Sequence, residues 1–375
     1  MVLGVWVLAV VLGGVYLFER GAIGDTAAAQ EFADEAEQAP DGPDSPTKTT
    51  IPEPLASAPL TLAAGGDVIG DRKVGAFIDS QGGQAALSRV APLLSRADVA
   101  YVNLESPASD QGTPDPDKDV VFRGRPQLIT GLQAAGVDLV SLANNHALDW
   151  GEAALTDTIA RLLAAGIRPA GAGENLAAAR RPAVMEVNGD RAALLAYSLI
   201  LPAGFPAGEE RAGINPGRPE QQRLLADIRA AALEYEWVIV SIHWGVEYES
   251  AANADQRALA HRMVEAGADV VLGHHPHVIQ GLEIYRDAVI AYSLGDFVFD
   301  HRSRETGEAF VLEATLREGQ PPSLQITPVY LSDAHGIPAV VEDEAADRIL
   351  SRLATLSSPF GLALERQEDL LTYAP

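Results

Sequence analysis

Three of the chain's eight histidines stand within four positions, in the stretch VVLGHHPHVIQ at 270–280. The stretch starts as an apolar run, so the histidines follow the end of a predicted buried strand. Because Pro276 disfavours a helical backbone at the residue before it, we expect an extended loop in which alternate side chains point the same way. His275 and His277 should then converge on one side as a metal-binding pair. His274 should turn elsewhere, as a solvated loop residue.

Polar side chains follow four other apolar runs in a similar way. Asp67 follows the run at 59–66, Glu105 the run at 97–104, Asn145 and His146 the run at 137–144, and His243 lies near the end of the run at 237–244. Open α/β sheets bind ligands at the carboxyl ends of their strands, so these side chains should meet the histidine pair. Imidazole, carboxylate and amide ligands without thiolates suit Mn, Fe or Zn ions better than Mg²⁺. The sequence therefore predicts a divalent metal site.

Several of these residues also have an ordinary structural explanation. Asp67 and Glu105 could be helix caps or loop acids. A single histidine such as His243 is more often a hydrogen-bonded core residue than a ligand. The matching ends of neighbouring strands favour the metal interpretation for all three.

The rest of the pattern indicates which elements position these side chains. Apolar runs rich in Val, Ile and Leu alternate with helical segments, which is typical of a sheet covered by helices on both faces. The dipeptide Asn188-Gly189 predicts a hairpin between two β-like runs. Helical periodicity marks 82–97, 127–136, 152–166, 255–267 and 342–358, and further strand-like runs stand at 268–274, 288–295, 308–316 and 323–331. We expect an α/β fold, with the segment after residue 300 packed on the same domain.

Composition narrows the possible functions. The chain has 375 residues, 47% of them hydrophobic, and 21% are charged, which fits a globular protein with a substantial core. Its formal net charge of −25 excludes nucleic acid as a partner, because phosphate backbones are bound by clustered Lys and Arg. The absence of cysteine excludes disulfides, thiolate metal sites and lipoprotein-type anchoring.

The first residues differ from all the others. Residues 1–18, MVLGVWVLAVVLGGVYLF, are uncharged and almost wholly apolar. As a helix they would span about 27 Å, close to the roughly 30 Å hydrocarbon thickness of a bilayer. Residues 19–59 are acidic and rich in Pro and Ala, which predicts a disordered tether. We expect a transmembrane anchor or a signal, and favour an uncleaved anchor that attaches an extracytoplasmic domain to the cytoplasmic membrane.

Seven short motifs stand in order along the chain: GGDVIGD (65–71), NLESP (103–107), FRGRP (122–126), SLANNHALDWG (141–151), SIHWGVEY (241–248), ADVVLGHHPHVIQ (268–280) and YSLGDFVFD (292–300). In these motifs the sequence resembles the CapA (poly-γ-glutamate capsule synthesis) family, whose core is similar to calcineurin-like metallophosphoesterases. The resemblance implies a layered sheet sandwich flanked by helices. It covers a domain at 60–300, with a C-terminal extension at 301–375.

The resemblance also implies roles for single residues. The implied ligands of one or two divalent ions are Asp67, Glu105, Asn145, His243, His275 and His277. His146 would be the catalytic general acid, oriented by Asp149, while Arg123, Arg125 and Asp296 would lie near an anionic substrate. Two positions depart from the related pattern: Ile69 stands where phosphoesterases usually have a histidine ligand, and Asp296 stands where the family usually has Asn.

Three functions remain open at this point. The resemblance implies an envelope protein that supports synthesis or export of an anionic capsule polymer such as poly-γ-glutamate, together with capsule synthase components. The second function is a membrane-anchored, metal-dependent phosphoesterase with no role in the capsule. The third is a degenerate fold that only binds the polymer. His146 beside Asn145 favours an active site, whereas Ile69 favours degeneracy.

Overall fold

The computed structural model describes residues 58–219 and 221–375. The predicted transmembrane anchor at 1–18, and all but the last two residues of the predicted tether at 19–59, lie outside the described residues. Within the described ranges, no helix is both long enough and apolar enough to cross a membrane.

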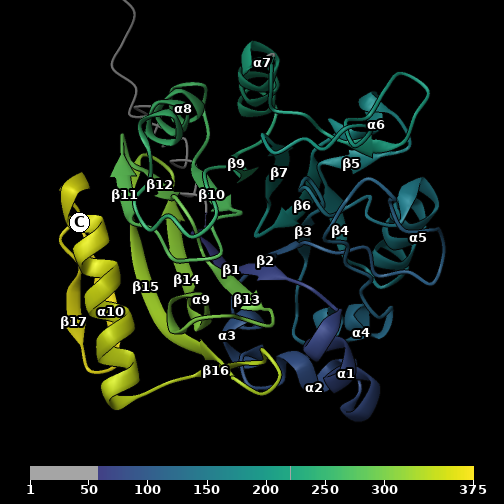
Figure 1. The fold of residues 1–375 in the computed structure, drawn as a ribbon. Coiled ribbons are helices and arrows are strands. Elements are labelled where there is room, and N and C mark those ends of the chain that lie inside the picture. Colours follow the sequence, from purple (N-terminus) through teal and green to yellow (C-terminus); the bar gives the residue numbers. More distant parts are fainter. Residues whose placement is uncertain (1–57, 220) are drawn as a thin grey trace, which may run out of the picture. The chain divides into compact units, whose positions relative to one another are not determined.

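The larger of the two main sheets is parallel on one side and antiparallel on the other (Figure 1). Its parallel side runs from β1 (Leu60–Val68) through β2 (Val99–Leu104) and β3 (Leu139–Ser141) to β4 (Arg168–Ala170). Its antiparallel side contains β14 (Glu308–Arg317), β15 (Gln320–Leu331), β18 (Leu370–Tyr373) and β17 (Glu365–Gln367). In addition, β13 (Asp296–Val298) pairs with β1 and β16 (Pro338–Val340) pairs with β15. The strands after residue 300 thus continue the sheet that β1 begins.

The second sheet has six strands. Their order is β11 (Leu282–Tyr285), β12 (Ala288–Ala291), β10 (Val270–His274), β9 (Trp237–His243), β7 (Asp190–Ser198) and β6 (Ala183–Val187). The predicted hairpin is confirmed: β6 and β7 pair antiparallel, and Asn188 and Gly189 have φ of 53° and 95° between them. A small two-stranded sheet joins β5 (Ala172–Gly173) to β8 (Gly213–Ile214).

Alternation along the strands explains why the two sheets pack together. Leu60, Leu62 and Ala64 of β1 face the same apolar core as Val270 and Leu272 of β10. The intervening residues of each strand face away from this core, into two outer ones. Successive side chains of a strand point to opposite faces of its sheet. Both sets are apolar here, so both faces of each sheet are buried. Each large side chain buried in this way contributes about 1.5–3 kcal/mol of transfer free energy.

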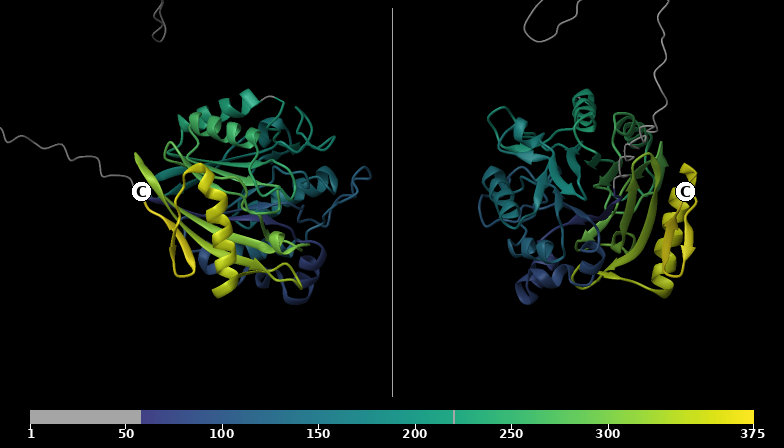
Figure 2. Two further views of the ribbon diagram at one scale, coloured as in Figure 1. Left: turned by 60° about the vertical axis from the view of Figure 1, so that its left-hand side comes forward. Right: turned by 180° about the vertical axis from the view of Figure 1, so that it is seen from behind.

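Helices cover the two outer faces. On the larger sheet lie α1 (Arg72–Gln81), α2 (Gly83–Leu87), α3 (Ala91–Leu94), α4 (Gln127–Ala134) and α5 (Gly151–Ala164); on the second sheet lie α7 (Gln221–Ala232) and α8 (Ala254–Glu265). The C-terminal helix α10 (Asp343–Ser357) packs along β15 and β11 at one side of the molecule (Figures 1 and 2). Three short helices complete the fold: α6 (Leu176–Ala179), α9 (Arg304–Gly307) and η1 (Ser358–Phe360). The expectation of a mixed α/β fold with layered sheets and helices is confirmed.

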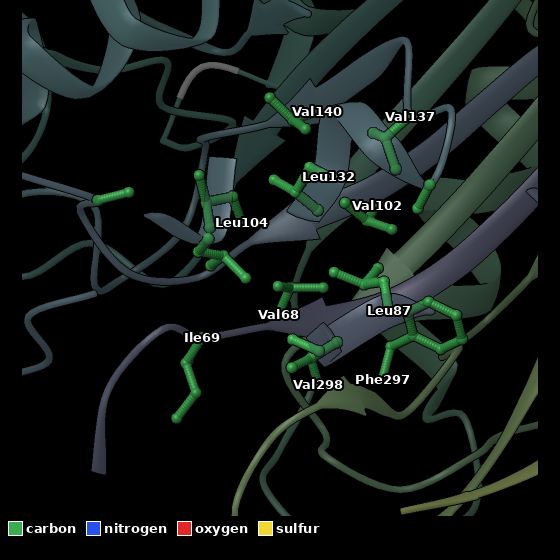
Figure 3. Close-up of a cluster of buried hydrophobic side chains, with 14 of the residues drawn as sticks. Val68, Ile69, Leu87, Val102, Leu104, Leu132, Val137, Val140, Phe297 and Val298 are labelled. Carbon is green, nitrogen blue, oxygen red and sulfur yellow. The ribbon is translucent and has the colours of Figure 1, made fainter. Parts of the chain in front are cut away.

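Ile69 belongs to this packing. It is fully buried in the cluster between the larger sheet and its helices, together with Val68 and Val298 (Figure 3). Its backbone N–H donates to the carbonyl of Val298 at 2.9 Å. The end of the first strand therefore offers one candidate ligand, Asp67, and an aliphatic side chain two residues later.

Candidate metal centre

The carboxyl ends of the central strands of both sheets bring the predicted ligands together. Asp67 lies opposite Asn103 in the β1–β2 register, and His243 lies opposite His274 in the β9–β10 register. Of the six predicted ligands, five are buried and Asn145 is half-buried. The strand-end pattern thus gathers residues that are more than 200 positions apart in the sequence.

Asp67 is the most strongly held carboxylate of the centre. Its Oδ1 accepts hydrogen bonds from Asn103 Nδ2 at 2.9 Å and lies 2.7 Å from His274 Nδ1. Its Oδ2 accepts from the backbone N–H of His275 at 3.3 Å. Although burial alone would raise the pKa of Asp67, the charge and hydrogen bond of His274 hold it well below its ordinary value. Asp67 is therefore ionised across the neutral range.

His274 does not turn away into solvent, so that prediction was wrong. It is fully buried, and its Nε2 lies 2.8 Å from the hydroxyl of Tyr101. That hydroxyl in turn donates to Ser241 Oγ at 2.7 Å. The physical reason is alternation: His274 stands two residues after Leu272, which faces the core between the sheets, so His274 points inward and orients Asp67.

The predicted extended conformation of the loop was also wrong. His275 and His277 have φ of 96° and 58°, in the region that only glycine adopts readily. The backbone is anchored here because Pro276 O accepts from the N–H of Tyr248 at 2.8 Å. The two rings nevertheless lie close together, with centroids 6.0 Å apart. The pair converges through a tight turn, which sequence spacing does not predict.

The side chain of Glu105 is buried at the centre of this group of predicted ligands. Within the described part of the chain, neither of its carboxylate oxygens is hydrogen-bonded, and the same holds for Nδ1 of His243 and Nδ1 of His275. Burial, reinforced by the neighbouring charge of Asp67, raises the pKa of Glu105 well above its ordinary value. Buried polar atoms are normally satisfied, so such a group of open acceptors fits a bound cation.

Three overlapping groups of side chains have ligand atoms close enough to hold a metal ion. In each group the atoms lie within 4.8 Å of one another: Asp67 with Glu105 and His243; Glu105 with His275 and His277; and Asp67 with His277 and Asp296. Asn145 Oδ1 lies 2.7 Å from His243 Nε2, which also lies 3.6 Å from Glu105 Oε1. These buried His, Asp and Glu groups could bind a metal ion.

Asp296, which is predicted to lie near an anionic substrate, lines the cavity and also lies against a candidate ligand. Its Oδ1 lies 2.8 Å from His277 Nδ1. Against the opposing effect of burial, the charge of Asp296 raises the pKa of His277 to about 9. Burial raises the pKa of Asp296 itself to about 7, despite the opposing charge of His277. The extra negative charge at this position therefore acts first on His277.

The structure places Asp149 beside His146. Asp149 Oδ2 lies 2.6 Å from His146 Nδ1 and accepts from the backbone N–H of Phe122 at 2.7 Å. Lys118 donates to the other oxygen of Asp149 and to the carbonyl of Asn145. Burial lowers the pKa of His146 despite the hydrogen bond that its Nδ1–H donates to Asp149, so the ring is neutral near pH 7. This arrangement leaves His146 Nε2 free to exchange a proton at the cavity.

A cavity of about 340 Å³ lies beside these residues and is lined by Asn145, His146, His277 and Asp296. Neither Arg123 nor Arg125 lines it. Arg123 stacks 4.1 Å from the centroid of Trp150 and donates to the carbonyls of Ser109 and Asp110; Arg125 is paired with Asp79 and Asp71. Arg123 and Arg125 are the residues predicted to lie near an anionic substrate. The basic residues that line the cavity are instead Arg72, Lys118 and Arg302.

Arg72 and Lys118 differ in how far the sequence could have marked them as cavity residues. Arg72 directly follows the motif GGDVIGD, and its position beside a motif was a signal that could have been used. Lys118 stands in the stretch DPDKD, where neither periodicity nor spacing distinguishes it from a solvated loop charge. Only the fold places it on Asp149.

The fold and the site define a class: layered α/β proteins with a buried His- and carboxylate-rich centre beside a cavity. Residues 61–301 match the family described as Bacterial capsule synthesis protein PGA_cap, and the chain belongs to that family. The resemblance stated from the motifs is thereby confirmed.

Relatives match over most of their length. The capsule biosynthesis protein CapA of Bacillus anthracis is 30% identical over 319 residues, which cover 83% of this chain and 77% of the relative. The PGA biosynthesis protein CapA of Bacillus subtilis (strain 168) is 30% identical over 308 residues, covering 82% and 80%. A protein of Mycobacterium tuberculosis (strain H37Rv) named "Probable polyglutamine synthesis accessory protein" is 34% identical over 296 residues, covering 74% and 77%.

Proposed function

We propose that this protein supports the synthesis or export of an anionic capsule polymer of the poly-γ-glutamate type, and that it does so through a metal-dependent site. Membership of the capsule synthesis family and the names of the two Bacillus relatives support the polymer. The apolar segment 1–18 and the acidic segment 19–59 support attachment of the domain to the outer face of the cytoplasmic membrane, near capsule synthase components.

The observation that carries the metal-dependent site is the buried, unpartnered carboxylate of Glu105. It lies between Asp67, His243, His275 and His277, in two of the three groups able to hold an ion. Isolated buried carboxylates are costly, and a divalent cation would neutralise two of them at once. The donor set, with imidazole and carboxylate but no thiolate, suits Mn, Fe or Zn.

The chemistry we propose is hydrolysis or transfer at a phosphoester, in the manner of metallophosphoesterases. When bound, a divalent ion supplies Lewis-acid polarisation and neutralises developing negative charge. His146, held by Asp149 at Nδ1, can accept a proton at Nε2 and return it to a leaving group. Asp67 and Glu105 fix the charge of the centre, and the aromatic side chains of Phe122 and Phe299 limit access of water to one wall of the cavity.

The test is metal content by elemental analysis of the purified full chain, prepared without chelator. We expect one to two equivalents of a transition metal per chain in the parent, and a marked loss in Glu105→Gln and His243→Ala. His335→Ala is the matched control, because that ring contacts Phe77, with centroids 5.3 Å apart, and belongs to none of the three groups able to hold an ion. A parent with no metal would contradict the metal-dependent site and leave a polymer-binding scaffold.

The net charge of the chain favours a second function, that of a phosphoesterase without a role in the capsule. The net charge of −25 repels a polyanion, so direct binding of the polymer depends on local positive charge. Deletion of the gene, with complementation by the parent and by His243→Ala, separates the two functions. Loss of surface polymer that only the parent restores supports the capsule role, whereas unchanged polymer in the deletion strain contradicts it.

A further inference from the structure

Arg72, the first residue of α1, lies on the cavity wall close to the proton-transfer group. Its guanidinium carbon is 4.5 Å from the centroid of the Phe122 ring. The centroid of that ring is in turn 4.2 Å from the centroid of His146. One aromatic ring therefore separates the positive charge of Arg72 from the imidazole of His146.

The guanidinium of Arg72 forms one ion pair, with Asp300, and leaves further donors for a ligand. Among residues 58–219 and 221–375, no hydrogen bond engages its guanidinium, and its side chain is 30% exposed. The nearest acid is Asp300, whose Oδ1 lies 3.6 Å away and is itself buried without a hydrogen-bond partner in the described chain. A guanidinium presents five N–H groups in a planar fork that matches carboxylate and phosphate oxygens.

The other arginines near the motif are in a different state. Arg123 and Arg125 both donate hydrogen bonds to oxygens of the protein itself. Lys118 is likewise engaged, by Asp149 and the carbonyl of Asn145. Arg302 lines the same cavity as Arg72 and adds positive charge there.

Backbone strain also marks this wall. Nine described residues other than glycine have positive φ, and three of them line the cavity: Arg72 at 51°, Tyr248 at 65° and His277 at 58°. Each such conformation costs on the order of 1–3 kcal/mol and is kept only where surrounding structure imposes it. Arg72 shares this conformation with Tyr248 and His277, so three strained positions lie on the walls of one cavity.

We propose that Arg72 binds an oxyanion of the substrate, a carboxylate or a phosphate, that lies beside the linkage being attacked. This inference rests on the proposed function and names its substrate class: a compound with a second anionic group next to the reacting one. Asp119, Glu247 and Asp300 stand on the same walls. Their negative charge opposes that of an anionic ligand, so binding there depends on the positive charge of Arg72 and Arg302.

The experiment uses the purified full chain loaded with Mn²⁺ and three probes in calorimetric titrations. The probes are a γ-linked glutamate trimer, the same trimer with its carboxyl groups methylated, and methyl phosphate. Arg72→Met keeps the apolar stem over Phe122 and removes the charge, while Arg72→Lys keeps the charge without the fork. Arg123→Met is the matched control, because its guanidinium lies over Trp150, outside the cavity.

Arg72→Met should weaken binding of the trimer or of methyl phosphate on the order of 10- to 100-fold. Arg72→Lys should recover part of that loss, and Arg123→Met should match the parent. The methylated trimer should bind the parent no better than it binds Arg72→Met. A loss confined to the trimer identifies a carboxylate, and a loss confined to methyl phosphate identifies a phosphate.

Four results would overturn the assignment: unchanged affinity in Arg72→Met, an equal loss with the methylated trimer, an equal loss in Arg123→Met, or a metal-loaded parent that binds neither anion. Thermal unfolding of each variant shows whether it is folded. Metal content of each sample separates the two proposals. A parent that holds no metal counts against the proposed function, whereas a metal-loaded parent with an unaffected Arg72→Met variant counts against Arg72 alone.

Discussion

Two buried polar clusters meet at the cavity, and they differ in how far the protein satisfies their hydrogen bonds. In the cluster of His146, Asp149 and Lys118, both oxygens of Asp149 have partners within the chain. In the cluster around Glu105, neither carboxylate oxygen has one among the described residues. The first cluster is organised by the polypeptide alone. The second contains carboxylates, imidazoles and acceptor atoms without hydrogen-bond partners, which is what a cation-binding site requires.

The largest expected effect comes from removing the unpartnered charge. Glu105→Gln should abolish most metal binding, since Glu105 belongs to two of the three candidate groups. In chelator at pH 7, however, the variant should be more stable than the parent by about 1–3 kcal/mol, because the raised pKa of Glu105 means that ionising it costs folding free energy. Urea denaturation with Mn²⁺ and with chelator should therefore rank the two proteins in opposite orders.

A second buried glutamate serves as the control for this reversal. Glu308 is equally buried but is held by Arg348 and Arg352 of α10. Glu308→Gln should lower stability with and without metal, by about 3–5 kcal/mol if the pair acts as a buried ion pair. If Glu105→Gln behaves like Glu308→Gln in chelator, the distinction between the two kinds of buried carboxylate is wrong.

A substitution in the cluster of His146, Asp149 and Lys118 should lower activity without lowering metal content. Asp149→Asn leaves the candidate ligands in place, so metal content should stay at the parent level. Hydrolysis of a p-nitrophenyl phosphoester should fall on the order of 10²- to 10⁴-fold, because the amide no longer selects the Nδ1–H form of His146. Elemental analysis and initial rates on the same samples check both points. Equal loss of metal and of rate would show that the two clusters are one unit.

Sequence reasoning captured the parts of this architecture that depend on periodicity. Continuous apolar runs predicted the buried strands, and Asn188-Gly189 predicted the hairpin that the structure contains. Reading the residues after each apolar run then brought together distant side chains such as Asp67 and His275, because parallel strands end at a common edge. These features follow from local chemistry and from one general rule of sheet geometry.

The rest depended on contacts that no local pattern encodes. The loop of His275 and His277 is held in a left-handed conformation by Tyr248 and Asp67, which are far away in the sequence. The inward turn of His274 depends on packing between two sheets. Arg123 and Arg125 stand in a motif but are engaged by their own neighbours, and a lone sequence does not reveal which basic side chains line the cavity.

A third carboxyl gives an intermediate case between the two clusters. Asp269 is half-buried, and among the described residues its carboxyl accepts one hydrogen bond, from the N–H of Val238 to Oδ2 at 2.7 Å. Burial raises its pKa to about 6 despite that bond. The folded state therefore keeps a proton that the unfolded chain loses near pH 4, and stability should fall as pH rises from about 4 to 6, by at most about 3 kcal/mol. Asp269→Asn keeps the acceptor and should remove this slope in urea denaturation at several pH values; an unchanged slope would contradict the assignment.

The smallest effect concerns protons that leave when the metal binds. His277 has a pKa of about 9 in the metal-free protein, so at pH 7 it carries a proton that it must lose to bind a metal. Burial lowers the pKa of His275 to about 3, so His275 is already neutral at pH 7. Mn²⁺ binding should therefore release protons, and affinity should rise about tenfold per pH unit for each proton released between pH 7 and 9. Calorimetry at pH 7 in two buffers with different heats of ionisation measures the number directly. Heats that do not depend on the buffer would mean that neither His277 nor Glu105 loses a proton when Mn²⁺ binds, which would contradict this prediction.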